Sequence, residues 1–198
     1  MMRSSSGRGR RSTLLAAGLL ALAAVAPTLS AQTILDQKSA ADIRTQFLAD
    51  LDSVHVKIMA LAETIPEAKY TWSPTPETRT IANALMHVAT EWYVYVPMAV
   101  AGKPPADFGA PRETVPRLEK ITAKADVLDH LRKAWAHARM TVETADLTPL
   151  LGSRQLGKRS ITFAEFAFAM TGDLHEHLGQ LVTYTRSIGE VPPWSRKP

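Results

Sequence analysis

Apolar side chains recur every three or four residues in four separate stretches of the chain. The clearest stretch, residues 41–65, carries Ile43, Phe47, Leu51, Val54, Ile58, Leu61 and Ile65. This spacing places apolar side chains on one face of an α-helix. Similar stripes predict helices over residues 80–100, 123–144 and 162–188, and no stretch shows a convincing strand alternation. The pattern therefore predicts an all-α protein, a four-helix bundle with long connecting loops.

Two of the predicted connections are long and rich in turn-forming residues. Residues 102–117 contain four prolines, and residues 146–160 contain two glycines and three basic residues. Proline and glycine both interrupt regular structure, so we predict loops for these segments. Their length allows crossover connections in place of a simple up-and-down topology. Thr162 and Glu165, three residues apart, fit a capping box at the start of the fourth helix.

The first 31 residues differ in character from the rest of the chain. Four arginines come first, an apolar run extends from Leu14 to Ala26, and small residues lead up to Ala31. This order is typical of a secretory signal peptide, with cleavage after Ala31. The apolar run, about 13 residues, is too short to span a bilayer comfortably, although an uncleaved anchor is the alternative. We therefore expect residues 32–198 to form an exported domain, periplasmic or extracellular, without a stable membrane span.

The positive charge of the chain comes from this N-terminal segment. The chain has 23 Lys and Arg against 19 Asp and Glu, and residues 1–31 hold four arginines and no acidic residue. Residues 32–198 are therefore formally neutral, which argues against a nucleic-acid partner, because such binding needs a basic surface. The chain has no cysteine, which excludes disulfides, thiolate metal ligands and a cysteine nucleophile.

An acidic residue and a histidine stand four residues apart in the last predicted helix. Residues at this spacing share one helix face, so Asp173 and His177 can reach one metal ion. Because a helix turns about 100° per residue, His177 lies near the centre of the apolar stripe, Asp173 at its edge and His175 towards solvent. The alternatives to a metal site are a hydrogen-bonded core histidine at position 177 and, for Asp173, an Asp–His ion pair or a solvated acid.

A third ligand must come from another helix. His87 is the best candidate, although its phase on the second helix is also that of a surface histidine. Glu91 follows one turn later and can hydrogen-bond to His87. His55 on the first helix is a reserve ligand, whereas His130 and His137 are predicted to face solvent from the third helix.

Four short segments of the chain form a characteristic set. They are residues 70–74 (YTWSP), 80–89 (TIANALMHVA), 177–186 (HLGQLVTYTR) and 189–193 (GEVPP). In order and spacing they resemble the DinB-like (damage-inducible) helical-bundle superfamily. Members of that superfamily typically bind a divalent metal ion, often zinc or nickel, through three histidines. One is on the second helix, and two lie four residues apart on the last long helix.

The resemblance implies a ligand set with one departure from the family pattern. It maps the family histidines onto His87 and His177, whereas Asp173 occupies the position of the third histidine. The implied metal ligands are thus His87, Asp173 and His177, and the implied cofactor is a divalent metal ion, zinc or nickel. Two histidines and one carboxylate form a competent divalent site. The departure is equally compatible with a relative that has lost its metal.

Two functions follow from this reading. The first is a metal-dependent hydrolase or transferase acting on a small molecule, with unassigned catalytic residues and Glu91 or Glu176 as candidates for proton transfer. The second is a non-catalytic exported bundle that binds a small ligand or partner without metal. DNA binding is suggested only by the superfamily name, and the neutral charge of residues 32–198 opposes it. Related bundles often dimerise, so a homodimer is compatible with both functions.

Overall fold

The computed structural model describes residues 35–197 of the chain. The signal peptide predicted for residues 1–31 lies outside these residues and stays a prediction. Among the helices of the described part, none combines the length and the apolar character that crossing a membrane requires.

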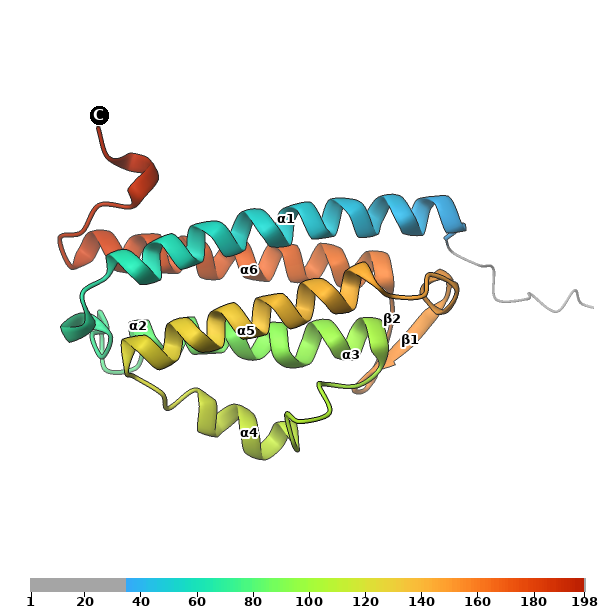
Figure 1. Ribbon diagram of the computed structural model, residues 1–198, viewed down its shortest axis with the longest axis horizontal. Coiled ribbons are helices and arrows are strands. Elements are labelled where there is room, and N and C mark those ends of the chain that lie inside the picture. Colours follow the sequence, from blue (N-terminus) through green and yellow to red (C-terminus); the bar gives the residue numbers. More distant parts are fainter. Residues whose placement is uncertain (1–34, 198) are drawn as a thin grey trace, which may run out of the picture. The chain divides into compact units, whose positions relative to one another are not determined.

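Four long helical stretches form the body of the described part, and they can be followed in Figure 1. Three of them are the α-helices α1 (Gln37–Thr64), α5 (Lys124–Glu143) and α6 (Phe163–Ser187). The other is composite and consists of α2 (Ile81–Thr90), a π-helical turn η2 (Glu91–Tyr95) and α3 (Val96–Ala101). The short 3-10 helices are η1 (Glu67–Lys69), η3 (Thr148–Leu151) and η4 (Pro193–Ser195). The all-α prediction is confirmed, because all four predicted stretches are helical.

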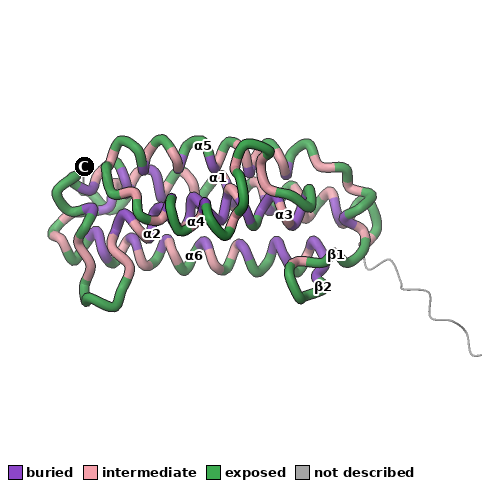
Figure 2. Tube along the Cα trace, turned by 90° about the horizontal axis from the view of Figure 1, so that it is seen from below, coloured by how far each residue is buried: buried purple, intermediate pink, exposed green. Residues whose placement is uncertain are grey.

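Each long stretch packs against two others around a common core. α1 contacts α5 and α6, and α2 also contacts α5 and α6, so α1 and α2 lie diagonally across the bundle. Buried positions gather on the inward faces of these helices (Figure 2). The composite stretch and α5 run in the same direction (Figure 1). The chain between them must therefore return along the bundle, which makes it a crossover connection.

The crossover contains a helix that the sequence analysis did not predict. α4 (Pro111–Leu118) lies in the segment 102–117 whose prolines indicated a loop. That prediction was wrong because Pro111 begins the helix, where no intrahelical N–H donor is needed. The crossover also lines small cavities with His130 and His137, which are half-buried. The prediction that these histidines face solvent was wrong, because it could not include a segment packed across α5.

The second predicted loop contains a small antiparallel hairpin. β1 (Ser153–Leu156) pairs with β2 (Arg159–Thr162). The prediction that the chain has no strands was wrong, because strands of four residues are too short to show a clear alternation of apolar and polar positions. Arg154 holds the hairpin to the bundle, because its guanidinium donates hydrogen bonds to the carbonyls of Ala99 and Val100 at the end of α3.

One part of the core holds a histidine between two tryptophans. The ring of His55 stacks on Trp135 with centroids 4.0 Å apart, and it meets Trp92 edge-on at 5.8 Å. Its Nε2 atom is buried and has no hydrogen-bond partner among the described residues. Burial therefore lowers the pKa of His55 from 6.5 to about 4. His55, the reserve metal ligand of the sequence analysis, is thus a neutral core residue.

We expect His55 to make the protein less stable as the pH falls. Its pKa is lower in the folded chain than in the unfolded chain, so protonation favours unfolding as the pH drops from 6.5 to about 4. Between pH 7.5 and pH 5 the loss should be about 1–2 kcal/mol, allowing for partial exposure of the ring. Urea unfolding of the natural protein and of His55→Phe, which keeps a ring on Trp135, measures this loss. The same pH dependence in both proteins would contradict the assignment.

Candidate metal centre

A π-helical turn interrupts the second helical stretch at Glu91. The N–H of Val96 bonds to the carbonyl of Glu91, five residues earlier, where an α-helix would use a separation of four. The extra residue rotates the positions that follow. Tyr95 belongs to the apolar stripe of a regular helix but is 48% exposed, whereas Val96 and Pro97 are buried. Glu91 points inward from the first position of the turn and is only 4% exposed.

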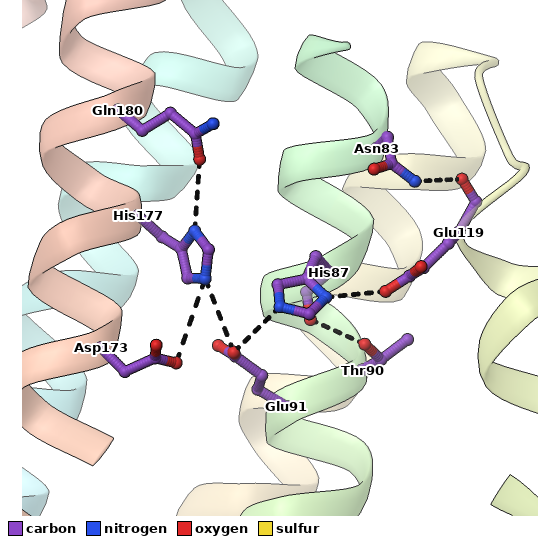
Figure 3. A network of polar contacts seen from close by, with 8 residues as sticks. All are labelled: Asn83, His87, Thr90, Glu91, Glu119, Asp173, His177 and Gln180. Atoms are coloured by element: carbon purple, nitrogen blue, oxygen red, sulfur yellow. Dashed lines mark hydrogen bonds and ion pairs between the residues drawn. The ribbon is translucent and has the colours of Figure 1, made fainter. Parts of the chain in front are cut away.

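Glu91 lies between histidines from two neighbouring helices (Figure 3). Its Oε1 atom is 3.3 Å from Nε2 of His87 on α2 and 3.6 Å from Nε2 of His177 on α6. The two imidazole rings meet edge-to-face with centroids 5.0 Å apart. Each of the three side chains offers one ligand atom, and these atoms all lie within 4.8 Å of one another. We call His87, Glu91 and His177 the His–Glu–His cluster.

The other ring nitrogen of each histidine is held by an oxygen acceptor. Nδ1 of His87 lies 2.7 Å from Oε1 of Glu119, which follows α4, and Nδ1 of His177 lies 3.3 Å from Oε1 of Gln180. Asn83 donates to the Glu119 carbonyl at 2.9 Å, and the Gln180 amide donates to the Tyr184 hydroxyl at 2.9 Å.

These contacts decide which ring nitrogen carries the proton. Because carboxylate and amide oxygens accept, Nδ1 is the donor in both His87 and His177. In the neutral rings the Nε2 lone pairs then face Glu91. Outer hydrogen bonds of this kind orient histidine ligands in metal sites.

The geometry of the cluster fits a divalent metal ion. Its two N–O separations, 3.3 and 3.6 Å, exceed the roughly 2.7–2.9 Å of a short charge-assisted hydrogen bond. Ligands at about 2.0–2.1 Å from a tetrahedral metal lie about 3.3 Å apart. The second carboxylate oxygen of Glu91 is buried and has no hydrogen-bond partner among the described residues. Two nitrogens and a buried carboxylate thus converge on one point.

The charge of Glu91 depends on its neighbours. Burial alone would raise the pKa of Glu91, but hydrogen bonding with His177, His87 and Asp173 outweighs it and lowers the pKa to about 2. Glu91 in turn raises the pKa of both histidines. A buried carboxylate therefore stays ionised at neutral pH and requires positive charge beside it, from a metal ion or a protonated histidine.

Asp173 lies at the rim of the cluster. Its Oδ2 atom is 4.0 Å from Nε2 of His177, and its side chain is 45% exposed against 5% for Glu91. Hydrogen bonding with Glu91 and burial together raise the pKa of Asp173 to about 6. The structure therefore brings His87 and His177 together, as the predicted site requires, and places Glu91 between them. The choice of Asp173 or Glu91 as third ligand stays a prediction.

From its place in the sequence, Glu91 is predicted only to hydrogen-bond to His87. The one signal that pointed further was its position four residues after His87, which lets both side chains reach one ion. Glu91 continues the face of α2 that carries His87, and that face lies against α6 through packing between helices, which periodicity does not reveal. His175 points away from the cluster, as its helical phase predicted, and its Nε2 atom lies 2.9 Å from Asp50 on α1.

A cavity of about 370 Å³ opens beside the cluster. His87, Glu91 and Asp173 contribute to its lining, together with residues of the hairpin and of the first half of α6. In catalytic metal sites, three protein ligands leave one coordination position open to water or substrate, and a cavity beside the ligands gives access to that position.

Comparison with known proteins agrees with this geometry. The family description of the DinB superfamily matches residues 38–181, a range that includes the His–Glu–His cluster and Asp173. No curated protein matches the chain. The matched range is most of the chain and extends from the start of α1 into the second half of α6. The chain therefore belongs to the DinB superfamily, a metal-binding family of helical proteins.

Proposed function

We propose that the protein binds one divalent metal ion through His87, Glu91 and His177 and acts as a metal-dependent hydrolase or transferase on a small molecule. The observation that carries this proposal is the convergence of two imidazole nitrogens on a buried, ionised carboxylate. The charged, apolar and small-residue order of residues 1–31 supports an exported location for this activity.

The donor set suits a transition-metal ion such as zinc or nickel and disfavours magnesium and calcium. Imidazole nitrogens suit zinc, copper, iron and nickel, whereas magnesium and calcium prefer oxygen ligands throughout. One carboxylate with two histidines is a known zinc set for catalytic sites. The absence of cysteine from the chain leaves imidazole and carboxylate as the strong ligands.

The surrounding residues each have a defined task. Glu119 and Gln180 hold the two rings so that the Nε2 atoms face inward. Asp173 lines the cavity, where its carboxyl group can hydrogen-bond to a bound molecule. Phe166 and Met170 form an apolar wall that limits water in the cavity. A bound divalent ion would supply Lewis acidity towards water or a polar group of the substrate.

One observation favours the metal-free alternative. The pKa values of His87 and His177 are both raised by Glu91, so protonated histidines can also neutralise the buried carboxylate. In that case the cluster is an ion network that stabilises a non-catalytic bundle. Metal analysis separates the two functions directly.

We expect the protein, purified without a histidine tag, to hold about one divalent ion per chain. His87→Ala and His177→Ala should each lose it, because each removes a nitrogen ligand. His175→Ala is the matched control, since His175 lies two residues away on the same helix but pairs with Asp50. Mass spectrometry of the metals measures the content.

A second measurement detects metal binding even if the ion is lost during purification. Zinc or nickel added at 100 times the dissociation constant should stabilise the natural protein by about 2.7 kcal/mol. If the purified protein holds no metal and its thermal stability is unchanged in excess zinc and nickel, the metal proposal is wrong. The protein is then the non-catalytic, metal-free bundle.

Two amide substitutions decide the third ligand. Glu91→Gln should weaken zinc binding by more than about tenfold, because it removes the charged oxygen between the two histidines. Asp173→Asn should weaken it less than tenfold, since Asp173 lies at the rim. Competition with a chromophoric chelator measures both affinities. The opposite order would establish Asp173 as the ligand and Glu91 as its partner.

Glu119 should tune the affinity without binding the metal. Removing a hydrogen-bond partner of a histidine ligand typically lowers metal affinity by about 10–100-fold. We expect this loss for Glu119→Ala, whose carboxylate contacts Nδ1 of His87. Glu113→Ala, on the exposed side of α4, is the control and should leave the affinity unchanged. Equal affinities of the two variants would exclude an orienting role for Glu119.

A further inference from the structure

The cavity beside the His–Glu–His cluster has walls of two kinds. One kind is polar and consists of His87, Glu91 and Asp173, with Tyr95 at the exposed end of the π turn. The other comes from the hairpin and the start of α6, and it includes one fixed positive charge, Arg159. The cavity therefore combines acidic groups and a cation in the same space.

The hairpin fixes where Arg159 can reach. Arg159 is the first residue of β2 and pairs with Leu156 across the tight turn. The hairpin is attached at one end by Arg154, which donates to the last carbonyls of α3. At its other end Thr162 begins α6 in a capping box with Glu165. Both attachments hold the backbone that carries Arg159 against the bundle.

Arg159 has no ion-pair or hydrogen-bond partner for its side chain among residues 35–197. The nearby carboxylate of Glu165 feels the charge of Arg159, which helps to lower its pKa, but its hydrogen bonds go to the start of α6. It accepts from the Thr162 N–H and from the Thr162 hydroxyl, both at 2.8 Å. An exposed guanidinium with five donors, which lines a cavity and hydrogen-bonds to no acid among the described residues, is suited to an anionic ligand.

The remaining lining is apolar. Ile161, Phe166 and Met170 are each at least nine-tenths buried, and Leu156 lies beside them at the hairpin turn. Burying a ligand's hydrocarbon part there stabilises the complex by about 25 cal/mol for each Å² of apolar surface removed from water. The acids Glu91 and Asp173 repel a negative group, so an anion is directed to Arg159 and away from them.

We propose that this cavity takes a small amphipathic anion. Its carboxylate or phosphate pairs with Arg159, and its hydrocarbon part lies on Leu156, Ile161, Phe166 and Met170. This inference names the class of molecule that the site binds. It rests on the proposed function only in calling that molecule a substrate. Binding of the anion does not require that the metal proposal holds.

Calorimetric titration of the zinc-loaded protein with octanoate tests the idea. Octanamide, which has the same chain without the charge, should bind at least about tenfold more weakly. Propionate, which keeps the charge and loses most of the chain, should also bind more weakly by about tenfold or more. Octyl phosphate distinguishes a preference for phosphate from one for carboxylate. Tighter binding than octanoate assigns the anion as a phosphate, and weaker binding assigns it as a carboxylate.

Arg159→Gln should weaken octanoate binding by about tenfold while leaving the zinc content unchanged. Lys158→Gln is the matched control, because Lys158 is the neighbouring base at the hairpin turn but does not line the cavity. Equal affinity of Arg159→Gln and the natural protein, or equal binding of octanoate and octanamide, would overturn the proposal.

The same titration on chelator-treated protein separates this proposal from the metal proposal. A carboxylate held by Arg159 should still bind after zinc is removed, and Arg159→Gln should still weaken it. Binding that disappears with zinc and does not depend on Arg159 would show a carboxylate on the metal, which overturns the assignment to Arg159. Absence of zinc uptake with octanoate binding intact would overturn only the proposed metal function.

Discussion

The buried carboxylate of Glu91 is the constraint around which the rest of the site is arranged. An ionised group that is 4% exposed is costly unless positive charge or donors surround it. His87 and His177 approach it from two helices, and Glu119 and Gln180 fix the rings from outside. A divalent ion would neutralise this carboxylate by using both Nε2 lone pairs and the carboxylate together, whereas protonated histidines would neutralise it through ion pairs.

A local departure from α-helical geometry begins at Glu91. One extra residue in the turn from Glu91 to Tyr95 changes the helical phase of the positions that follow by about 100°. As a result, Tyr95 leaves the core for the edge of the cavity, whereas Glu91, at the first position of the turn, keeps the phase of α2 and lies beside His87. π turns of this kind occur frequently at functional sites.

The crossover and the hairpin complete the site from outside the four long stretches. The end of α4 supplies Glu119, and the hairpin supplies Arg159 and part of the apolar wall. Both segments were read as loops, yet both contribute groups that the helices lack. In this member of the superfamily, the hairpin gives the cavity a positive charge. Phe166, Ala169 and Met170 of α6 supply much of the apolar lining. Variation of these connecting segments can therefore change the ligand while the bundle stays the same.

The sequence by itself determined what depends on neighbouring residues along the chain. The apolar repeats located all four long stretches, the capping box of Thr162 and Glu165 marked the start of α6, and helical phase placed His175 outside the site. Only the tertiary structure decided that Glu91, and not Asp173, lies between the two histidines. Likewise, it alone placed His55 between Trp92 and Trp135. The physical reason is that periodicity describes one helix at a time and assumes a regular one, whereas a site requires side chains from different helices to converge. That convergence depends on how the helices pack against one another.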